Sequence, residues 1–217
     1  MNSNEAVGSA RRIVWLDCEM TGLVINGEDP SRDDEIVEIG VIVTDGNLVP
    51  LDDGISLVIK PSDYAFESMN KFVRQMHTAS GLLEQIPNGI SVAEAEAKVM
   101  EYLKHHIPQR QTAQMGGNTI HMDRRFLAKY MPQVEDYVHY RSVDVSAIKE
   151  LSLRWFPEVF DAMPPKNGNH RALADAIESI QELTYYRELF FGATKFDAKQ
   201  LEDAAAKATD VWKNYLS

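Results

Sequence analysis

Apolar residues gather in strand-like runs in the first third of this chain, at 13–20, 36–44 and 55–59. Helical spacing takes over from Val92 to Ile107. Short strands are expected at 112–115 and 143–145, each followed by a helix. Because strands come first and then alternate with helices, the pattern predicts an α/β domain with a mixed five-stranded sheet flanked by helices. We expect its first three strands to pair antiparallel.

The last part of the chain predicts two further helices. The first begins near residue 169, and its expected core stripe leaves Asp175 on a separate face of small residues; the stripe consists of Leu173, Ile177, Ile180 and Thr184. After a break at 192–194, a sparse apolar stripe predicts an added helix packed on the core or on a partner, with Leu201, Ala205, Ala208 and Trp212 on that stripe. We therefore divide the chain into a flexible tail (1–10), one domain (11–192) and a helical extension (193–217).

The first strand carries two acidic residues inside an otherwise apolar run. Side chains alternate along a strand, so Asp17 and Glu19 share one face, opposite Leu16 and Cys18. Burying two like charges is costly unless cations neutralise them, and carboxylate ligands suit Mg²⁺ or Mn²⁺. The pattern indicates a metal site. Acid-x-acid pairs also arise by chance, so the alternative is that both residues face solvent at a sheet edge.

Two later segments carry further candidate chemistry. Asp123 shares an apolar helical stripe with Phe126, Leu127 and Tyr130, so it is expected on the inward face and needs a partner. Favourable placement near a positive helix N-terminus is the alternative. His170 comes just before or within the first turn of the late helix. A histidine with a near-neutral pKa is suited to deprotonating water, although a single histidine is more often an ordinary surface residue.

Composition indicates the cellular location of the protein and limits the size of any nucleic-acid substrate. The 217 residues include 44% hydrophobic and 25% charged residues, and no apolar run is long enough to span a membrane. The N-terminus lacks the basic and apolar segments of a secretion signal, and the single Cys18 fits a reducing environment, so we expect a cytoplasmic protein without membrane association. With 22 Lys+Arg against 33 Asp+Glu, the chain has little basic surface for long nucleic acid. Any nucleic-acid substrate should be short and held in a local pocket.

Taken together, the acids and the histidine resemble the DEDDh 3′-to-5′ exonucleases of the RNase H-like fold. The order is Asp-x-Glu on a first strand, Asp on a middle helix and His-x₄-Asp on a late helix. Longer segments resemble the oligoribonucleases in particular, over about residues 12–191: Trp15-Leu16-Asp17-Cys18-Glu19-Met20-Thr21-Gly22-Leu23, His77-Thr78-Ala79-Ser80-Gly81-Leu82, Asp123-Arg124-Arg125-Phe126-Leu127, His139-Tyr140-Arg141 with Asp144-Val145-Ser146, and His170-Arg171-Ala172-Leu173-Ala174-Asp175. The longer C-terminus is typical of actinobacterial-type members.

This resemblance implies a reaction and a set of residues for it. Two Mg²⁺ or Mn²⁺ ions would be coordinated by four carboxylates, with His170 as the general base. The substrate would be single-stranded RNA of about two to five nucleotides, cleaved from the 3′ end to nucleoside 5′-monophosphates. The four implied ligands are Asp17, Glu19, Asp123 and Asp175.

The resemblance also implies contacts that limit substrate length. Leu23 would wedge against the bases and His77 would lie near the 3′-terminal nucleotide. A second protomer of a homodimer would contribute an aromatic ring and a cap for the terminal phosphate, through Tyr140, Arg141 and Ser146. Thr119, where the family commonly carries serine, could join that cap.

Several alternatives stay open at this level. Tyr140 could be a core or dimer aromatic and Leu23 an ordinary turn residue. Asp144 is better explained as a helix N-cap than as a fifth metal ligand. A proofreading-type DNA exonuclease and a non-catalytic binding module remain as other functions; the acidic surface and the Tyr140-Arg141 segment argue against the first, and the five occupied catalytic positions against the second.

Overall fold

The computed structural model describes residues 11–25, 29–165, 170–191 and 198–212. The chain divides into two compact units, Met1–Thr184 and Tyr185–Ser217. The expected tail at 1–10 lies outside the described residues. Within the described part of the chain, no helix is both long and apolar enough to cross a membrane.

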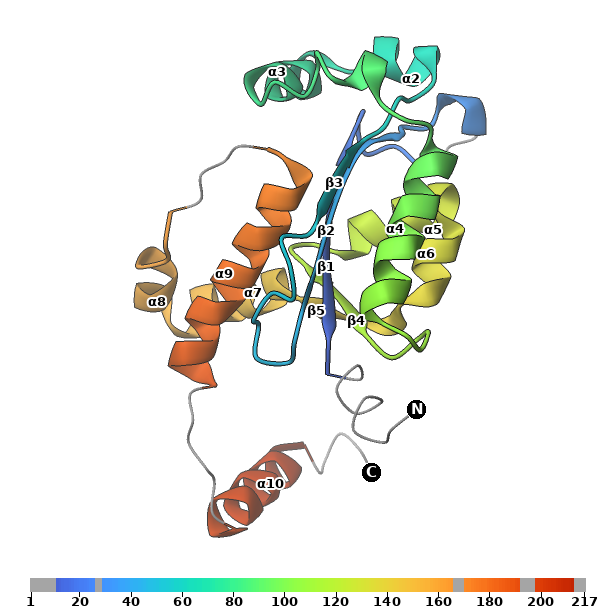
Figure 1. Cartoon of the computed structure of the whole chain (residues 1–217). Helices are drawn as coiled ribbons and strands as arrows, with labels where there is room; N and C mark the ends of the chain where they lie inside the picture. The colour runs from blue at the N-terminus through green and yellow to red at the C-terminus, as the bar shows by residue number, and fades with distance from the viewer. Residues whose placement is uncertain (1–10, 26–28, 166–169, 192–197, 213–217) are drawn as a thin grey trace. The chain divides into compact units, whose positions relative to one another are not determined.

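Five strands form one mixed sheet in the first unit, as predicted (Figure 1). They are β1 (Ile13–Met20), β2 (Ile36–Thr44), β3 (Ile55–Val58), β4 (Gln114–Gly117) and β5 (His139–Asp144). Their order is β3-β2-β1-β4-β5, with β1–β2 and β2–β3 antiparallel and β1–β4 and β4–β5 parallel. Two strands differ from their predicted ranges. β4 occupies 114–117 instead of 112–115, and β5 begins four residues earlier than the expected 143–145.

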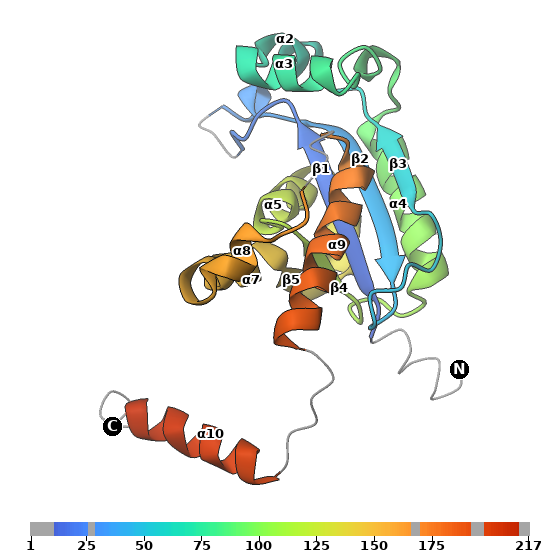
Figure 2. The same ribbon diagram turned by 90° about the vertical axis from the view of Figure 1, so that its left-hand side faces the viewer.

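Helices cover both faces of this sheet (Figures 1 and 2). On one face lie α4 (Val92–His106), α5 (His121–Tyr130) and α6 (Pro132–Tyr137). On the other lie α7 (Val145–Trp155), α8 (Pro157–Asp161) and the first part of α9 (Ala172–Phe190). Two shorter helices, α2 (Asp63–Ser68) and α3 (Lys71–Ala79), lie beyond the C-terminal end of β1. Two 3₁₀ turns complete the unit, η1 (Pro30–Arg32) and η2 (Ile86–Asn88).

The core forms where the predicted apolar faces meet. Leu16 and Cys18 of β1 are buried in one cluster with Val41 of β2, Leu103 of α4 and Phe126 of α5. Because helices cover both sides of the sheet, every residue of β2 is buried. A capping box at Ser91 begins α4 at the predicted place: the Ser91 amide and hydroxyl donate to the Glu94 carboxylate, and the Ser91 hydroxyl oxygen accepts from the Glu94 amide.

The predicted core stripe of α9 is right only in part. Ile180 is buried and Leu173 is half-buried, but Ile177 is 44% exposed and Thr184 is also exposed. Small residues are buried beside them: Ala172, Ala176 and Ser179. The cause is how closely the helix approaches the sheet. A Cβ added to Gly40 of β2 would lie 2.1 Å from the Leu173 backbone nitrogen, so only small residues fit between helix and strand. Asp175 therefore adjoins the buried face instead of lying away from it.

The second unit contains the end of α9 and the expected additional helix, α10 (Ala198–Trp212). Leu201 and Ala205, two of its four predicted stripe residues, are exposed. The side chains of Ala208 and Trp212 lie outside the described residues. The domain boundary at residue 192 stays a prediction.

Candidate active site

The two acids of β1 lie on the middle strand of the sheet. Asp17 is half-buried and Glu19 is only 7% exposed. The alternative that both face solvent at a sheet edge is therefore wrong. Pairing between β1 and β4 ends at Trp15↔Gly116, so both acids follow the point where the parallel strands separate. Such a point at the C-terminal end of parallel strands is where α/β sheets commonly bind ligands.

Asp123 is brought to the same place by α5. It stands in the first turn of the helix and is 5% exposed. Its Oδ1 accepts a hydrogen bond from the Cys18 amide, at 2.9 Å, and Cys18 lies between Asp17 and Glu19. The helix N-terminus also favours this carboxylate, so the two interpretations of Asp123 from sequence hold together.

The beginning of α9 supplies the remaining two residues. Asp175 is half-buried in its first turn, and the exposed His170, with a positive φ of 46°, lies two residues before the helix begins at Ala172. Ligand atoms of Glu19, His170 and Asp175 all lie within 4.8 Å of one another. Three separate elements, β1, α5 and the start of α9, thus converge on one cluster.

The electrostatics of this cluster suit a bound cation. Burial, together with the neighbouring Asp123, Asp175 and Glu19 carboxylates, raises the pKa of Asp17 well above its usual range. Burial and Asp175 raise the pKa of Glu19 to about 8, and burial raises that of Asp123 to about 7. Oxygen donors that repel each other in this way are the ligands that hard divalent ions prefer. The residues present therefore fit a metal centre.

His77 is placed beside the cluster but inside the protein. It ends α3 and is fully buried, with Nε2 at 2.9 Å from the Met20 carbonyl oxygen and Nδ1 at 3.8 Å from Glu19 Oε2. Burial lowers its pKa. A neutral ring donating from Nε2 holds the end of β1 in place. Its predicted contact with the 3′-terminal nucleotide stays a prediction.

Leu23 is presented by a turn that Asp34 organises. Its side chain is 63% exposed, three residues after β1 ends at Met20. The Asp34 carboxylate accepts from the Thr21 hydroxyl (2.9 Å) and from the Val24 amide (2.8 Å), on either side of Leu23. An exposed leucine on a bonded turn can contact a ligand base.

Tyr140 and Arg141 occupy a bulge in β5. The register passes from Gln114↔His139 to Met115↔Ser142, so these two residues have no partner on β4. Bulges re-aim side chains at sheet edges, and Tyr140 is accordingly 74% exposed, with its ring stacked on that of His139 at 4.4 Å between centroids. The Arg141 guanidinium lies 5.5 Å from the centre of the Tyr140 ring.

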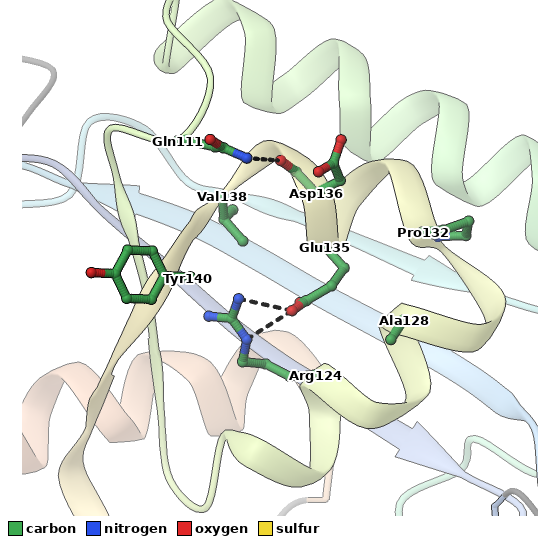
Figure 3. A pocket seen from close by; sticks show the side chains of 8 residues that line it. All are labelled: Gln111, Arg124, Ala128, Pro132, Glu135, Asp136, Val138 and Tyr140. Carbon is green, nitrogen blue, oxygen red and sulfur yellow. Dashed lines mark hydrogen bonds and ion pairs between the residues drawn. The ribbon is translucent and has the colours of Figure 1, made fainter.

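Arg124 spans this bulge from α5. Its Nη1 donates to the His139 carbonyl oxygen and to Ser142 Oγ, each at 3.1 Å, and its other nitrogens bond Glu135. Figure 3 shows Arg124, Glu135 and Tyr140 around one pocket of about 350 Å³. The guanidinium thus joins both ends of the bulged segment to α5 and α6.

Thr119 and Ser146 contact each other within one chain. The Thr119 amide donates to Ser146 Oγ (2.9 Å) and to Asp144 Oδ1 (3.0 Å), and the two hydroxyls are 3.1 Å apart. Asp144 also caps α7 through the Ser146 amide, which confirms its interpretation as an N-cap. Since Thr119 has a positive φ of 55°, these bonds hold an uncommon backbone conformation. Thr119 and Ser146 therefore lie side by side within one chain.

Sequence reasoning missed three residues that support the site: Asp34, Arg124 and Glu38. Glu38 is the only acid in the continuous buried run of β2, and a charged residue in such a run is a detectable signal. The other two have no such signal, because their partners lie in elements that only the fold brings together.

A mixed sheet with helices on both faces and a cluster of carboxylates that fits a metal ion is the arrangement expected of a metal-dependent nuclease. The chain belongs to the RNase T exonuclease family, whose model matches residues 14–183. It is accordingly a nuclease, a hydrolase of phosphodiesters. Curated relatives in this family resemble the chain over nearly their whole length and are oligoribonucleases.

The oligoribonuclease of Leifsonia xyli subsp. xyli is 52% identical over 205 residues, which cover 94% of this chain and 96% of the relative. That of Tropheryma whipplei is 49% identical over 182 residues, covering 84% and 95%. Membership of the oligoribonuclease family, expected from the motifs, is confirmed.

Solved structures support the fold. Escherichia coli exonuclease I, in a zinc-bound complex with single-stranded DNA, has a TM-score of 0.62 and 11% identity. The match covers 82% of this chain and 41% of that one. A second structure of this enzyme, with a dT13 oligonucleotide, has a TM-score of 0.59 and 15% identity, over 81% of this chain and 40% of that one. The chain therefore spans less than half the length of exonuclease I, and the likeness concerns the fold alone.

Proposed function

We propose that this protein is a metal-dependent 3′-to-5′ exoribonuclease that hydrolyses short oligoribonucleotides, dinucleotides above all, to nucleoside 5′-monophosphates and so completes RNA degradation. The observation that carries the proposal is the convergence of Asp17, Glu19, Asp123 and Asp175 with His170 at the C-terminal end of β1. The oligoribonuclease relatives support the choice of short RNA.

The four carboxylates would hold two divalent ions, Mg²⁺ or Mn²⁺. Such ions neutralise developing charge on phosphate oxygens and lower the pKa of water. The protein contributes the fixed positions of the carboxylates, because β1, α5 and α9 are rigid elements packed around the cluster.

His170 acts as the general base in this proposal. It takes a proton from the attacking water, whose oxygen forms a bond to the 3′-terminal phosphorus. The bond from phosphorus to the 3′ oxygen of the preceding nucleotide breaks, and this oxygen leaves with the shortened chain after protonation. The solvent exposure of His170 supports the role, since the proton can pass on to bulk water.

Length selection would come from a homodimer. Tyr140, Arg141 and Ser146 of one protomer would reach the partner's site, with Tyr140 stacking on a base and the other two binding the terminal phosphate. Leu23 and His77 would contact the substrate from the catalytic protomer. The outward bulge at Tyr140 and Arg141 supports this arrangement, and the Thr119–Ser146 contact adds Thr119 to the same side.

Two further parts of the proposal concern setting and organisation. We place the enzyme in the cytoplasm, where its RNA fragments arise and where the buried thiol of Cys18 stays reduced. We also propose that residues 193–217 form a helical extension outside the exonuclease domain of residues 11–192. Deleting them should leave the rate of dinucleotide hydrolysis within about twofold of the full chain; a tenfold loss would make the extension part of the catalytic unit.

Hydrolysis of 5′-labelled RNA of two, five and twenty nucleotides tests the function, with Mn²⁺ and with EDTA, beside a DNA 20-mer. We expect fast, EDTA-sensitive loss of the dinucleotide and slower loss of the 20-mer. Asp123→Asn should fold and lose hydrolysis, whereas Asp161→Asn, an exposed acid on α8, serves as the matched control. Preference for the DNA 20-mer would favour a DNA exonuclease, and retained activity in Asp123→Asn would remove the metal assignment.

Mixing inactive variants tests the dimer. Combining Asp17→Ala with Tyr140→Ala protein gives heterodimers in which, if Tyr140 acts on the partner, one site is intact and the other carries both changes. About a quarter of wild-type activity should return after confirmed subunit exchange. If Tyr140 acts within its own chain, both sites stay defective and no activity returns.

A further inference from the structure

A buried ion pair connects the strand beside the acidic cluster to the start of α9. Glu38 of β2 is fully buried and stands opposite Glu19 in the β1–β2 register. Its Oε1 accepts from Arg171 Nη2 at 2.8 Å, and both carboxylate oxygens lie 3.1 Å from Arg171 Nε. A bidentate pair of this kind fixes orientation as well as distance.

The same carboxylate also caps the helix. Glu38 Oε2 accepts from the Ala172 amide at 3.1 Å, an N-terminal N–H that has no partner inside the helix. Ser56 Oγ of β3 donates to Oε1 at 2.8 Å. Both Glu38 oxygens therefore accept hydrogen bonds from protein donors.

Arg171 stands between the two candidate catalytic residues of this segment. His170 directly precedes Arg171 in the sequence. The Arg171 carbonyl oxygen accepts the first helical hydrogen bond, from the Asp175 amide at 2.9 Å. Its guanidinium is held at a second point by Gln85 Oε1, 3.3 Å from Nη2. Moving Arg171 consequently moves both the base and the metal ligand.

Close packing makes the attachment rigid. The Gly40 contact leaves no space between β2 and the backbone of Ala172 and Leu173. Gly40 lies two residues beyond Glu38 on the same face of β2, so bonds and van der Waals contact act on the same turn of α9.

We propose that Glu38 and Arg171 form a clamp that positions His170 and Asp175 against β1. Both are positioning residues, acting through the start of α9, and the inference rests on the proposed function of the cluster. Partners that orient metal ligands typically change metal affinity 10- to 100-fold when removed.

Three variants test the clamp. Arg171→Ala removes the guanidinium from a partly exposed position, Glu38→Gln keeps the shape but not the charge, and Arg171→Lys keeps the charge without the bidentate geometry. Arg110→Ala is the matched control, because Arg110 pairs with Asp136 at 2.7 Å on an exposed surface. Mn²⁺ affinity by calorimetry, kcat and KM for a dinucleotide, and Tm are measured for each.

Arg171→Ala and Glu38→Gln should bind Mn²⁺ about 10- to 100-fold more weakly and lose kcat by a similar factor, with KM changed by less than about threefold. The Mn²⁺ affinity and kcat of Arg171→Lys should lie between those of the first two variants and those of wild type. Both values for Arg110→Ala should match wild type. If Mn²⁺ affinity and kcat per folded molecule stay within twofold of wild type, the clamp is only structural and the inference fails. If wild type itself binds no Mn²⁺, or Asp175→Ala does not weaken binding, the proposed function fails and the clamp with it.

Discussion

Two carboxyl groups of the cluster lie where the fold alone disfavours their charged form. Glu19 and Asp123 are nearly buried, and their pKa values are raised to about 8 and about 7. The Cys18 amide and the α5 N-terminus favour the Asp123 anion, but they do not offset its burial. A protein that keeps such groups together needs protons or cations to occupy the space between them.

The metal-free protein should therefore lose stability as pH rises from about 4.5 to 8. Over this range the folded state retains protons on Glu19 and Asp123 that the unfolded chain releases, so the free energy of unfolding decreases. A Tm series in EDTA between pH 5 and pH 8 measures the effect. Saturating Mg²⁺ or Mn²⁺ should raise Tm more at pH 8 than at pH 5, because the ion displaces protons.

Glu19→Gln provides the control for this prediction. His77, whose pKa is lowered by burial, changes stability in the opposite direction as pH rises, so the comparison with wild type isolates the carboxylate. The variant should flatten the decline between pH 5 and pH 8. An equally steep decline in Glu19→Gln would assign the pH dependence to other groups.

Much of the candidate site could be predicted because each acid breaks a local rule. Asp17 and Glu19 interrupt an apolar strand, and Asp123 occupies an apolar helical stripe. Glu38 breaks the same rule within β2, yet its role depends on Arg171, which is 133 residues away in sequence. Tyr140 and Arg141 could be identified by resemblance, but no local pattern predicts the bulge that exposes them, since a bulge is defined by pairing with β4.

At the scale of elements, the contact between α9 and β2 decides where His170 and Asp175 lie. Sequence periodicity placed Ile177 on the inner face of α9, whereas the structure buries the small residues Ala172 and Ala176 at the start of the helix and exposes Ile177. The rule of burying the largest apolar stripe fails there because Gly40 admits the helix backbone itself. The first three strands, by contrast, were predictable because they are apolar runs bounded by turns and prolines, whereas β4 and β5 are short and less apolar and differ from their predicted ranges.

Gly40→Ala should destabilise the protein by about 2 kcal/mol or more, because the added methyl overlaps the backbone of Ala172 and Leu173. Gly81→Ala is the contrast: its Cβ meets nothing within 4 Å, and only its φ of 72° costs energy, about 1 kcal/mol. Urea denaturation gives both values. Equal effects of the two changes would mean that α9 shifts freely on the sheet.

Arg124→Ala should loosen the bulge of β5. The change removes the bonds to His139 and Ser142 and leaves the Glu135 carboxylate half-buried without its cation, at a cost of about 2 kcal/mol. We also expect the preference for dinucleotides over a 20-mer to decrease. The neighbouring Arg125→Ala, which removes an exposed side chain, should change neither Tm nor preference. Unchanged preference in Arg124→Ala would separate the bulge from length selection.

At the scale of the whole molecule, the net charge of −11 limits how nucleic acid can bind. Without an extended basic surface, few counterions are released, and affinity should depend weakly on salt. Between 50 and 200 mM KCl, KM for a dinucleotide should rise less than about tenfold, as expected for one or two phosphate contacts. A rise of a hundredfold or more would reveal a basic binding surface that the composition does not suggest.

The bulge of β5 also has a consequence for the two free edges of the sheet. Long, flat edges invite another strand to add, which leads to aggregation. At one edge, two unpaired residues interrupt β5, and one of them is a charged arginine. At the other, β3 has only four residues, and the amides of Lys60 and Ile90 continue it into a neighbouring segment. The feature that turns Tyr140 outward therefore also protects the sheet against unwanted strand addition. Deleting the two unpaired residues, Tyr140 and Arg141, should restore regular pairing with β4 and lower solubility as well as substrate contact.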